Sequence, residues 1–297
     1  MKLSKFIFPL AVFSFSMVSC VDSDKTNDKK DSTEPNNNQT DADVVKVGNR
    51  LFSIPSPVQT SILVKASGAE YDKSLLNDDK ASERYDTKTL KSVNLGIYGA
   101  DLGYVNLYGQ TQDAVNYLNA AKNLSDDLGV TSAFSEEFIT QFQDNLGNTD
   151  SLLLIVSDAY QIIDEYLQNN ENNDVGGLVL AGGWIEALYF TTQVYKTNPT
   201  KELKQRIGEQ KFSIVNLVKM LNSYNNDMDE YQDLVSGLED LQNTYDAVEV
   251  TYEYAEPEVF EEKKLSIIKN KTEVNLNDAI IKDITEKIAS IRTNITQ

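Results

Sequence analysis

The spacing of apolar residues in the C-terminal third of the chain constrains the fold most. Isoleucines recur every three or four residues from Ile281 to Ile295, and tyrosines and leucines keep the same spacing from Tyr231 to Tyr252. This repeat of about 3.5 residues places the apolar side chains on one face of an α-helix. Pro257 separates the two runs. They therefore predict an antiparallel helical hairpin over about residues 227–297.

The rest of the body has the same helical signature. No alternating strand pattern of any length occurs, so residues 51–297 are expected to form a single all-α domain, a multi-helix bundle or an irregular helical array. Asn198 and Pro199 are expected to cap and start a helix, and residues 169–174 to form a loop. The other expected helices cover about residues 57–67, 87–109, 112–128, 152–167 and 178–195, with one more beginning at Ser135.

The N-terminus predicts export and lipid attachment. Lys2 and Lys5 precede an apolar segment, residues 6–18, which is shorter than the roughly 20 residues of a membrane span. The following Ser19-Cys20 pair contains the only cysteine of the chain. The sequence Met17-Val-Ser-Cys20 resembles the lipobox of bacterial lipoproteins. That resemblance implies a signal peptide over residues 1–19 and a mature chain that begins with an acylated, palmitate-bearing Cys20.

The segment after the cysteine predicts a tether. Residues 20–50 are rich in Asp and Asn and contain little that can be buried, so they are expected to be disordered. Asp22 and Asp24, close behind Cys20, resemble the export signal of bacteroidete-type surface lipoproteins. We therefore expect a lipid-anchored protein of the cell envelope, at the outer membrane, on either its surface or its periplasmic face.

Composition excludes several kinds of chemistry. The chain has 46 acidic and 27 basic residues, a net charge of −19, which disfavours nucleic acid as a partner. It has no histidine, which excludes Ser-His-Asp catalysis and imidazole ligands. No cofactor, metal site or catalytic group is indicated. Carboxylates, lysine, tyrosine, serine and threonine remain as functional groups.

Two of the predicted helices are unusually rich in glycine. Gly96, Gly99 and Gly103 lie on one of them, and four glycines between residues 176 and 183 lie on the other. A glycine inside a helix costs about 1 kcal/mol relative to alanine, so the pattern needs a reason. The reason is either close packing of two backbones or a ligand against the bared backbone. We expect the two helices to touch or to share a cavity.

Each glycine-rich helix also carries an acid followed three residues later by a tyrosine. The pairs are Asp101 with Tyr104 and Glu186 with Tyr189, and Trp184 lies beside the second. Two facing carboxylates can act as acid and base, bind a ligand or accept hydrogen bonds inside a core. A sugar-binding interpretation rests on the 15 tyrosines and on Trp184. These five residues are the candidate binding site.

Three segments, FSIPSP, LGIYGADLGY and GGWIEALY, resemble an uncharacterised family of bacteroidete-type helical lipoproteins. The resemblance implies an exported α-helical lipoprotein and supplies no activity. We therefore expect an envelope protein that binds or scaffolds, with another envelope protein, a glycan or a peptide as its partner. A ligand-capture protein with a pocket between the glycine-rich helices, and a carboxylate-dependent hydrolase, are the alternatives. Oligomeric state cannot be predicted from these features.

Overall fold

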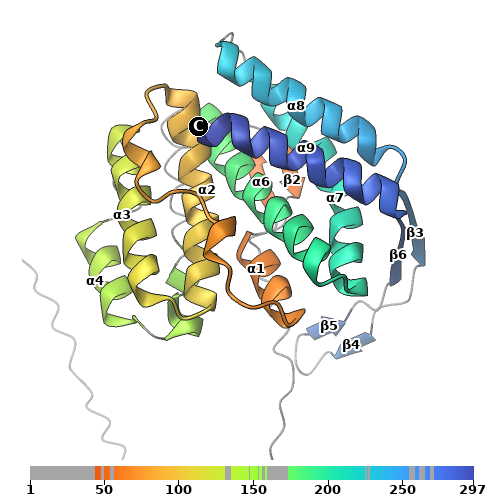
Figure 1. Ribbon diagram of the computed structural model, residues 1–297, viewed down its shortest axis with the longest axis horizontal. Coiled ribbons are helices and arrows are strands. Elements are labelled where there is room, and N and C mark those ends of the chain that lie inside the picture. Colours follow the sequence, from red (N-terminus) through yellow and green to blue (C-terminus); the bar gives the residue numbers. More distant parts are fainter. Residues whose placement is uncertain are drawn as a thin grey trace, which may run out of the picture. The chain divides into compact units, whose positions relative to one another are not determined.

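The protein is an array of α-helices, as the sequence predicts (Figure 1). The computed structural model describes residues 44–47, 50–53, 57–130, 135–146, 148–152, 154–155, 158, 173–224, 226, 228–253, 258–260, 265–267 and 271–297. The predicted signal peptide, Cys20 and most of the predicted tether lie outside these residues, as does most of the helix expected at 152–167.

The described α-helices have boundaries that local sequence explains. Side chains at the N-caps Thr87, Ser135 and Asn277 each accept a hydrogen bond from the backbone N–H three residues on. Glycines with positive φ follow α1, α2 and α3. The helices are α1 (Pro57–Ala66), α2 (Lys88–Leu107), α3 (Thr111–Asp127), α4 (Glu136–Asp144), α6 (Asn173–Thr197), α7 (Lys201–Leu221), α8 (Asp229–Tyr245) and α9 (Asp278–Thr296). The 3-10 turns η2 (Lys73–Leu75) and η3 (Ala81–Glu83) lie between α1 and α2.

Two predictions about the ends of α6 and α7 were wrong. Asn173 and Asp174, expected in a loop, form the first turn of α6, where an acidic residue favours the helix dipole. Asn198 does not cap α7. Thr200 accepts from the Leu203 N–H instead, and the Asn198 side chain donates to the Ser67 carbonyl oxygen at 2.8 Å.

Short antiparallel strands accompany the helices. β1 (Val44–Val47) pairs with β2 (Arg50–Ser53), within a segment predicted to be tether as far as residue 50. β3 (Glu249–Glu253) pairs with β6 (Lys271–Asn275), and β4 (Glu258–Phe260) with β5 (Leu265–Ile267). The helical run predicted to reach Tyr252 therefore ends at Tyr245. Valine and threonine in β3 and β6 favour strand over helix, which explains the change.

The predicted C-terminal hairpin is confirmed, with the β3–β6 ribbon between its helices. Three contacts run in opposite order along α8 and α9: Gly237 with Ile291, Asp240 with Lys287 and Thr244 with Asp283. The two helices are therefore antiparallel. Leu238 and Ile288, which belong to the two apolar runs, are both fully buried.

Helices α2 and α6 form the centre of the fold, and the expected contact between them is confirmed. A Cβ atom at Gly96 would overlap the carbonyl oxygen of Val179, and one at Gly182 would overlap that of Val93. The two backbones therefore touch at Gly96 and Gly182, so close packing is the reason for these two glycines. Gly103, expected in the same contact, faces α1 instead: a Cβ atom at this position would lie 3.4 Å from Val58 Cγ2.

Helix α6 is a core helix. Residues 174–197 are long and apolar enough to cross a membrane by length and composition, and 83% of the most apolar window is buried inside the protein. Its two sides face two apolar clusters, one containing Tyr98 and Phe190 and the other Trp184 and Ile288. Burial by neighbouring helices accounts for its apolar character.

Candidate functional site

The structure brings Asp101 of α2 and Glu186 of α6 together, as expected from the contact between their helices. Both side chains are 0% exposed. The charge of Glu186 acts on Asp101, and because one arginine lies beside the two carboxyl groups, the site is neutral when one of them carries a proton. The candidate acids therefore form one buried pair.

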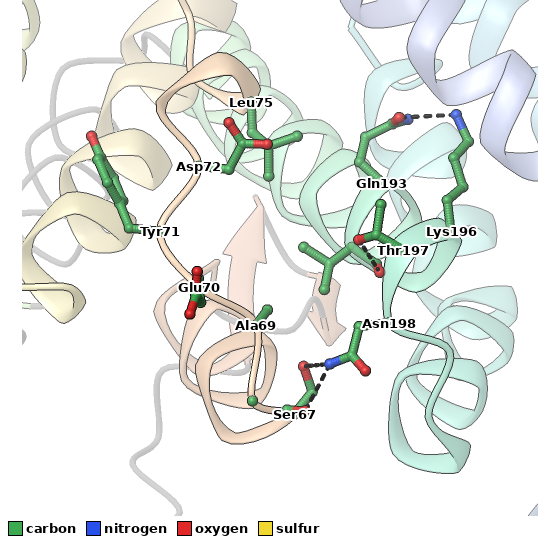
Figure 2. A pocket seen from close by; sticks show the side chains of 12 residues that line it. Ser67, Ala69, Glu70, Tyr71, Asp72, Leu75, Gln193, Lys196, Thr197 and Asn198 are labelled. Carbon is green, nitrogen blue, oxygen red and sulfur yellow. Dashed lines mark hydrogen bonds between the residues drawn. The ribbon is translucent and has the colours of Figure 1, made fainter.

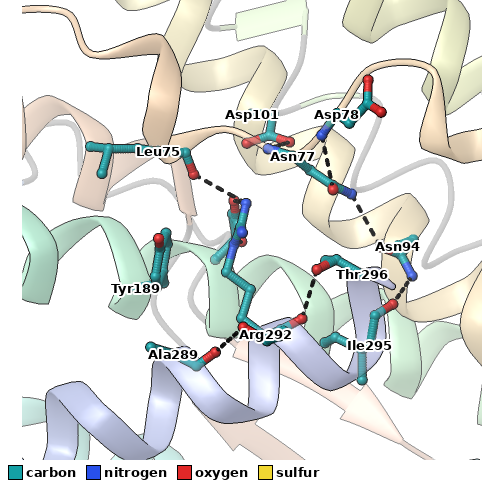
Figure 3. A network of polar contacts seen from close by, with 12 residues as sticks. Leu75, Asn77, Asp78, Asn94, Asp101, Tyr189, Ala289, Arg292, Ile295 and Thr296 are labelled. Atoms are coloured by element: carbon teal, nitrogen blue, oxygen red, sulfur yellow. Dashed lines mark hydrogen bonds and ion pairs between the residues drawn. The ribbon is translucent and has the colours of Figure 1, made fainter.

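Arg292 of α9 completes this pair into a buried charge cluster (Figure 3). Its Nε donates to Glu186 Oε2 at 2.6 Å and its Nη2 to Glu186 Oε1 at 2.7 Å, a bidentate pair. The guanidinium also lies 4.4 Å from the ring centroid of Tyr189. The Arg292 side chain is only 12% exposed. We call Asp101, Glu186 and Arg292 the buried triad.

The electrostatics place the extra proton on Asp101. Burial raises the pKa of Asp101, and the negative charge of Glu186 raises it further, while Arg292 and the Asn77 N–H oppose the shift. Asp101 Oδ1 has no donor among the described residues, whereas Oδ2 accepts from the Asn77 N–H at 3.3 Å. A neutral Asp101 beside the Glu186–Arg292 ion pair leaves the triad without net charge.

The triad is tied to the loop before α2. Arg292 Nη2 donates to the Leu75 carbonyl oxygen at 3.1 Å. Tyr117 Oη donates to the Asn77 carbonyl oxygen at 2.6 Å, and Tyr98 Oη to that of Asp78 at 2.7 Å. A loop whose backbone groups are satisfied by buried side chains is fixed in place. The triad and the two tyrosines therefore together hold residues 75–78 in place.

The three aromatic candidates have separate positions. Tyr189 stacks on Arg292. Tyr104 is buried, its hydroxyl accepts from the Asp72 N–H at 3.1 Å, and its ring centroid lies 4.9 Å from that of Phe190. Trp184 is 2% exposed and donates to Gln210 Oε1 at 2.9 Å. Neither of these two rings is available to a sugar.

An open groove of about 730 Å³ is lined by the segment that leads into residues 75–78 (Figure 2). One wall is the segment we call the strap, residues 67–75, and the other is the last turn of α6 with the residues that follow it. Its volume is within the range of ligand sites, about 300–1,000 Å³. The side chains that characterise it are Glu70, Tyr71, Asp72, Gln193, Lys196 and Asn198.

The strap is held by contacts outside the groove. Tyr71 Oη donates to Asp113 Oδ2 at 2.7 Å, and Lys73 Nζ lies 2.5 Å from Asp113 Oδ1. Tyr108 Oη donates to the Ala69 carbonyl oxygen at 2.8 Å. Leu75 joins groove and triad, because its side chain lines the groove while its carbonyl oxygen binds Arg292. One wall of the groove is therefore connected to the buried triad through Leu75.

Sequence reasoning missed Arg292 and the strap. A signal for Arg292 exists, since it follows Ile288 by four residues and so lies on the apolar face of α9. The strap carries no periodic pattern, and its role depends on contacts with Asp113 and Tyr108, about 40 residues away in the chain.

Comparisons of the chain with protein-family models, with curated proteins and with solved structures give no match in any of the three.

Proposed function

We propose that this protein is a lipid-anchored ligand-binding protein of the bacterial cell envelope, which captures a glycan or a peptide in the groove between the strap and the end of α6. The anchor follows from the signal sequence and Cys20. The observation that carries the binding role is the open groove of about 730 Å³, whose wall is fixed by buried polar contacts. Ligand sites are commonly preformed in this way.

The buried triad supports binding rather than hydrolysis. A general acid or base has to come within hydrogen-bonding reach of its substrate. Asp101 and Glu186 are both 0% exposed, and the glycine-rich backbones touch beside them. The triad accordingly acts by holding one wall of the groove in place. The alternative of a scaffold without a ligand has no specific observation in its favour.

A bulky side chain in the groove tests the proposal. The detergent-purified full chain is applied to one array of short peptides and one of oligosaccharides. Thr197 lines the groove, is exposed, and donates its hydroxyl hydrogen bond to its own helix at Val194. Thr197→Trp fills the groove and is expected to weaken binding by about tenfold or more, a change of roughly 1.4 kcal/mol.

Thr293→Trp is the matched control. Thr293 is also exposed and bonds to its own helix, at Ala289, but it lies on α9 and does not line the groove. This variant is expected to bind as the wild type does. Absence of binding to both arrays, or equal binding by the two tryptophan variants, would show that the groove is not a ligand site.

A further inference from the structure

We propose that the groove binds an extended peptide with basic side chains, and that the main chain of the peptide pairs with the strap at Glu70. This inference rests on the proposed function and names its ligand class. Three features carry it: free backbone donors on the strap, fixed ends of the strap, and the charge of the groove.

The strap offers unpaired main-chain groups to the groove. Residues 69–72 belong to no helix or strand, and Asp72 is extended, with φ −128° and ψ 103°. The N–H groups of Ala69, Glu70 and Tyr71 have no partner among the described residues. All three residues line the groove. In an extended segment the main-chain groups of successive residues point to opposite sides, and Tyr108 binds the Ala69 carbonyl oxygen on the side away from the groove. Glu70 is therefore the residue whose main chain can face the groove and pair with an added peptide strand.

The strap is already ordered before any peptide arrives. Asn198 Nδ2 donates to the Ser67 carbonyl oxygen at 2.8 Å, and the Asp72 N–H donates to Tyr104 Oη at 3.1 Å. Between these two points, Tyr108 Oη donates to the Ala69 carbonyl oxygen. These bonds fix both ends of the strap and the carbonyl group of Ala69. A preorganised strap loses little conformational entropy on binding, which favours affinity.

The charge of the groove selects a basic peptide. Glu70 and Asp72 are exposed acids, and Lys196 is the one basic side chain among the described lining residues. Lys196 Nζ is bonded to Gln193 Oε1 at 2.9 Å. The C-terminal end of α6, which carries partial negative charge, closes the same side. Lysine or arginine side chains in the peptide complement this surface.

The aromatic content favours a peptide over a glycan. Sugars stack on an open aromatic face, and Tyr71 is the single aromatic among the described lining residues. Its ring packs against Tyr104 at 5.7 Å and Tyr108 at 5.8 Å, and its hydroxyl is bound to Asp113. Tyr71 therefore acts as a brace for the strap.

Three synthetic hexapeptides test the inference with the full chain in detergent. All are acetylated and amidated: one alternates lysine and valine, one alternates glutamate and valine, and one is the lysine peptide with every second amide N-methylated. Fluorescence anisotropy is expected to show binding of the lysine peptide and at least about tenfold weaker binding of the other two. Equal affinity for the N-methylated peptide, or for the glutamate peptide, would overturn the inference.

Neutralising the groove provides the matched protein variants. Glu70→Gln with Asp72→Asn removes two charges and keeps a side-chain oxygen to accept from the Ser74 N–H, as Asp72 does at 2.9 Å. This double variant is expected to bind the lysine peptide about three- to tenfold more weakly. Glu83→Gln with Asp86→Asn, exposed acids that do not line the groove, is expected to leave the affinity unchanged.

The outcomes separate this inference from the proposed function. If oligosaccharides bind, peptides do not, and Thr197→Trp abolishes the binding, the groove is a ligand site and the peptide assignment is wrong. If the lysine peptide binds and Thr197→Trp leaves its affinity unchanged, the peptide binds elsewhere and the inference fails. If no probe binds, both proposals fail.

Discussion

Asp101, Glu186 and Arg292 meet where water is excluded, so their charges have to nearly cancel in the folded protein. Among the residues that the structure describes, Arg292 is the one basic residue paired with these two carboxyl groups. The structure resolves this imbalance with a proton on Asp101, whose pKa is raised by burial and by Glu186. Two consequences for stability follow at this scale, one for pH and one for mutation.

Asp101→Asn should change how stability depends on pH. A carboxyl group with a raised pKa contributes stability that is fully present below its unfolded pKa, about 3.9, and is lost as pH rises through its folded pKa. Asparagine resembles the protonated acid and does not titrate. Above about pH 4, the difference in unfolding free energy should shift in favour of the variant by up to about 1.4 kcal/mol per pH unit until the folded pKa is passed. Urea unfolding across pH 5–9 measures this.

Asp113→Asn serves as the control of opposite sign. Burial would raise the pKa of Asp113, but hydrogen bonds from Lys73 and Tyr71 lower it overall. Its contribution is present above the unfolded pKa, about 3.9, and is lost as pH falls through the folded pKa, so urea unfolding of this variant is extended below pH 4. Parallel stability curves for Asp101→Asn and the wild type would refute the assignment of the proton.

The two partners of the buried ion pair should differ in what their loss costs. Arg292→Leu leaves two carboxyl groups in a buried site without a cation and should cost about 3–5 kcal/mol of unfolding free energy at neutral pH. In Glu186→Gln, Asp101 can lose its proton and pair with Arg292, so the expected loss is about half as large or less. Urea unfolding of both variants at one pH tests this. Equal losses would show that Asp101 does not take over the charge.

The central element pair, α2 and α6, depends on bare backbone. Gly96 and Gly182 each lie against a carbonyl oxygen of the opposite helix, so neither position has room for a methyl group. Such close approach is the condition under which glycine in a helix repays its intrinsic cost. It also brings Asp101 and Glu186, which lie five and four residues further along, to the same interface.

Gly96→Ala should therefore separate the helices. The added Cβ would overlap the Val179 carbonyl oxygen, which belongs to backbone and cannot rotate away. The expected loss is about 3 kcal/mol or more of unfolding free energy, at the upper end for overpacking. Gly103→Ala on the same helix is the matched control, because its Cβ would meet Val58 at an ordinary 3.4 Å. That variant should be neutral or up to about 1 kcal/mol more stable. Similar melting temperatures for both would contradict the packing.

Sequence predicted elements better than it predicted their register and their loops. Apolar periodicity gave the helices and the α8–α9 hairpin, because burial on one face has to repeat every three or four residues. It did not tell Gly96 from Gly103 as the contact point, since the rotation of one helix against another depends on side chains from both. The role of Arg292 depends on Glu186, over 100 residues away, and the strap is fixed by tertiary contacts without any periodic signal.

On the scale of the whole molecule, the proposed function depends on where the chain is anchored. A net charge of −19 for the full chain disfavours adsorption to anionic lipid. Among the described residues, the single helix apolar enough to span a bilayer is the buried α6. The proposed location in the envelope therefore depends on Cys20, which lies outside the described residues.

Cys20→Ser tests this dependence directly. Serine has nearly the same size but no thiol to acylate, and each acyl CH₂ contributes about 0.8 kcal/mol to membrane insertion. The variant is expected to have an intact mass that lacks acyl chains, and either to keep its signal peptide or to be mislocalised; a cleaved form should leave the detergent phase in a Triton X-114 partition. Ser23→Ala, three residues further on, is the control and should partition as the wild type does. A Cys20→Ser protein that enters the detergent phase at the mature, acylated mass would exclude Cys20 as the anchor.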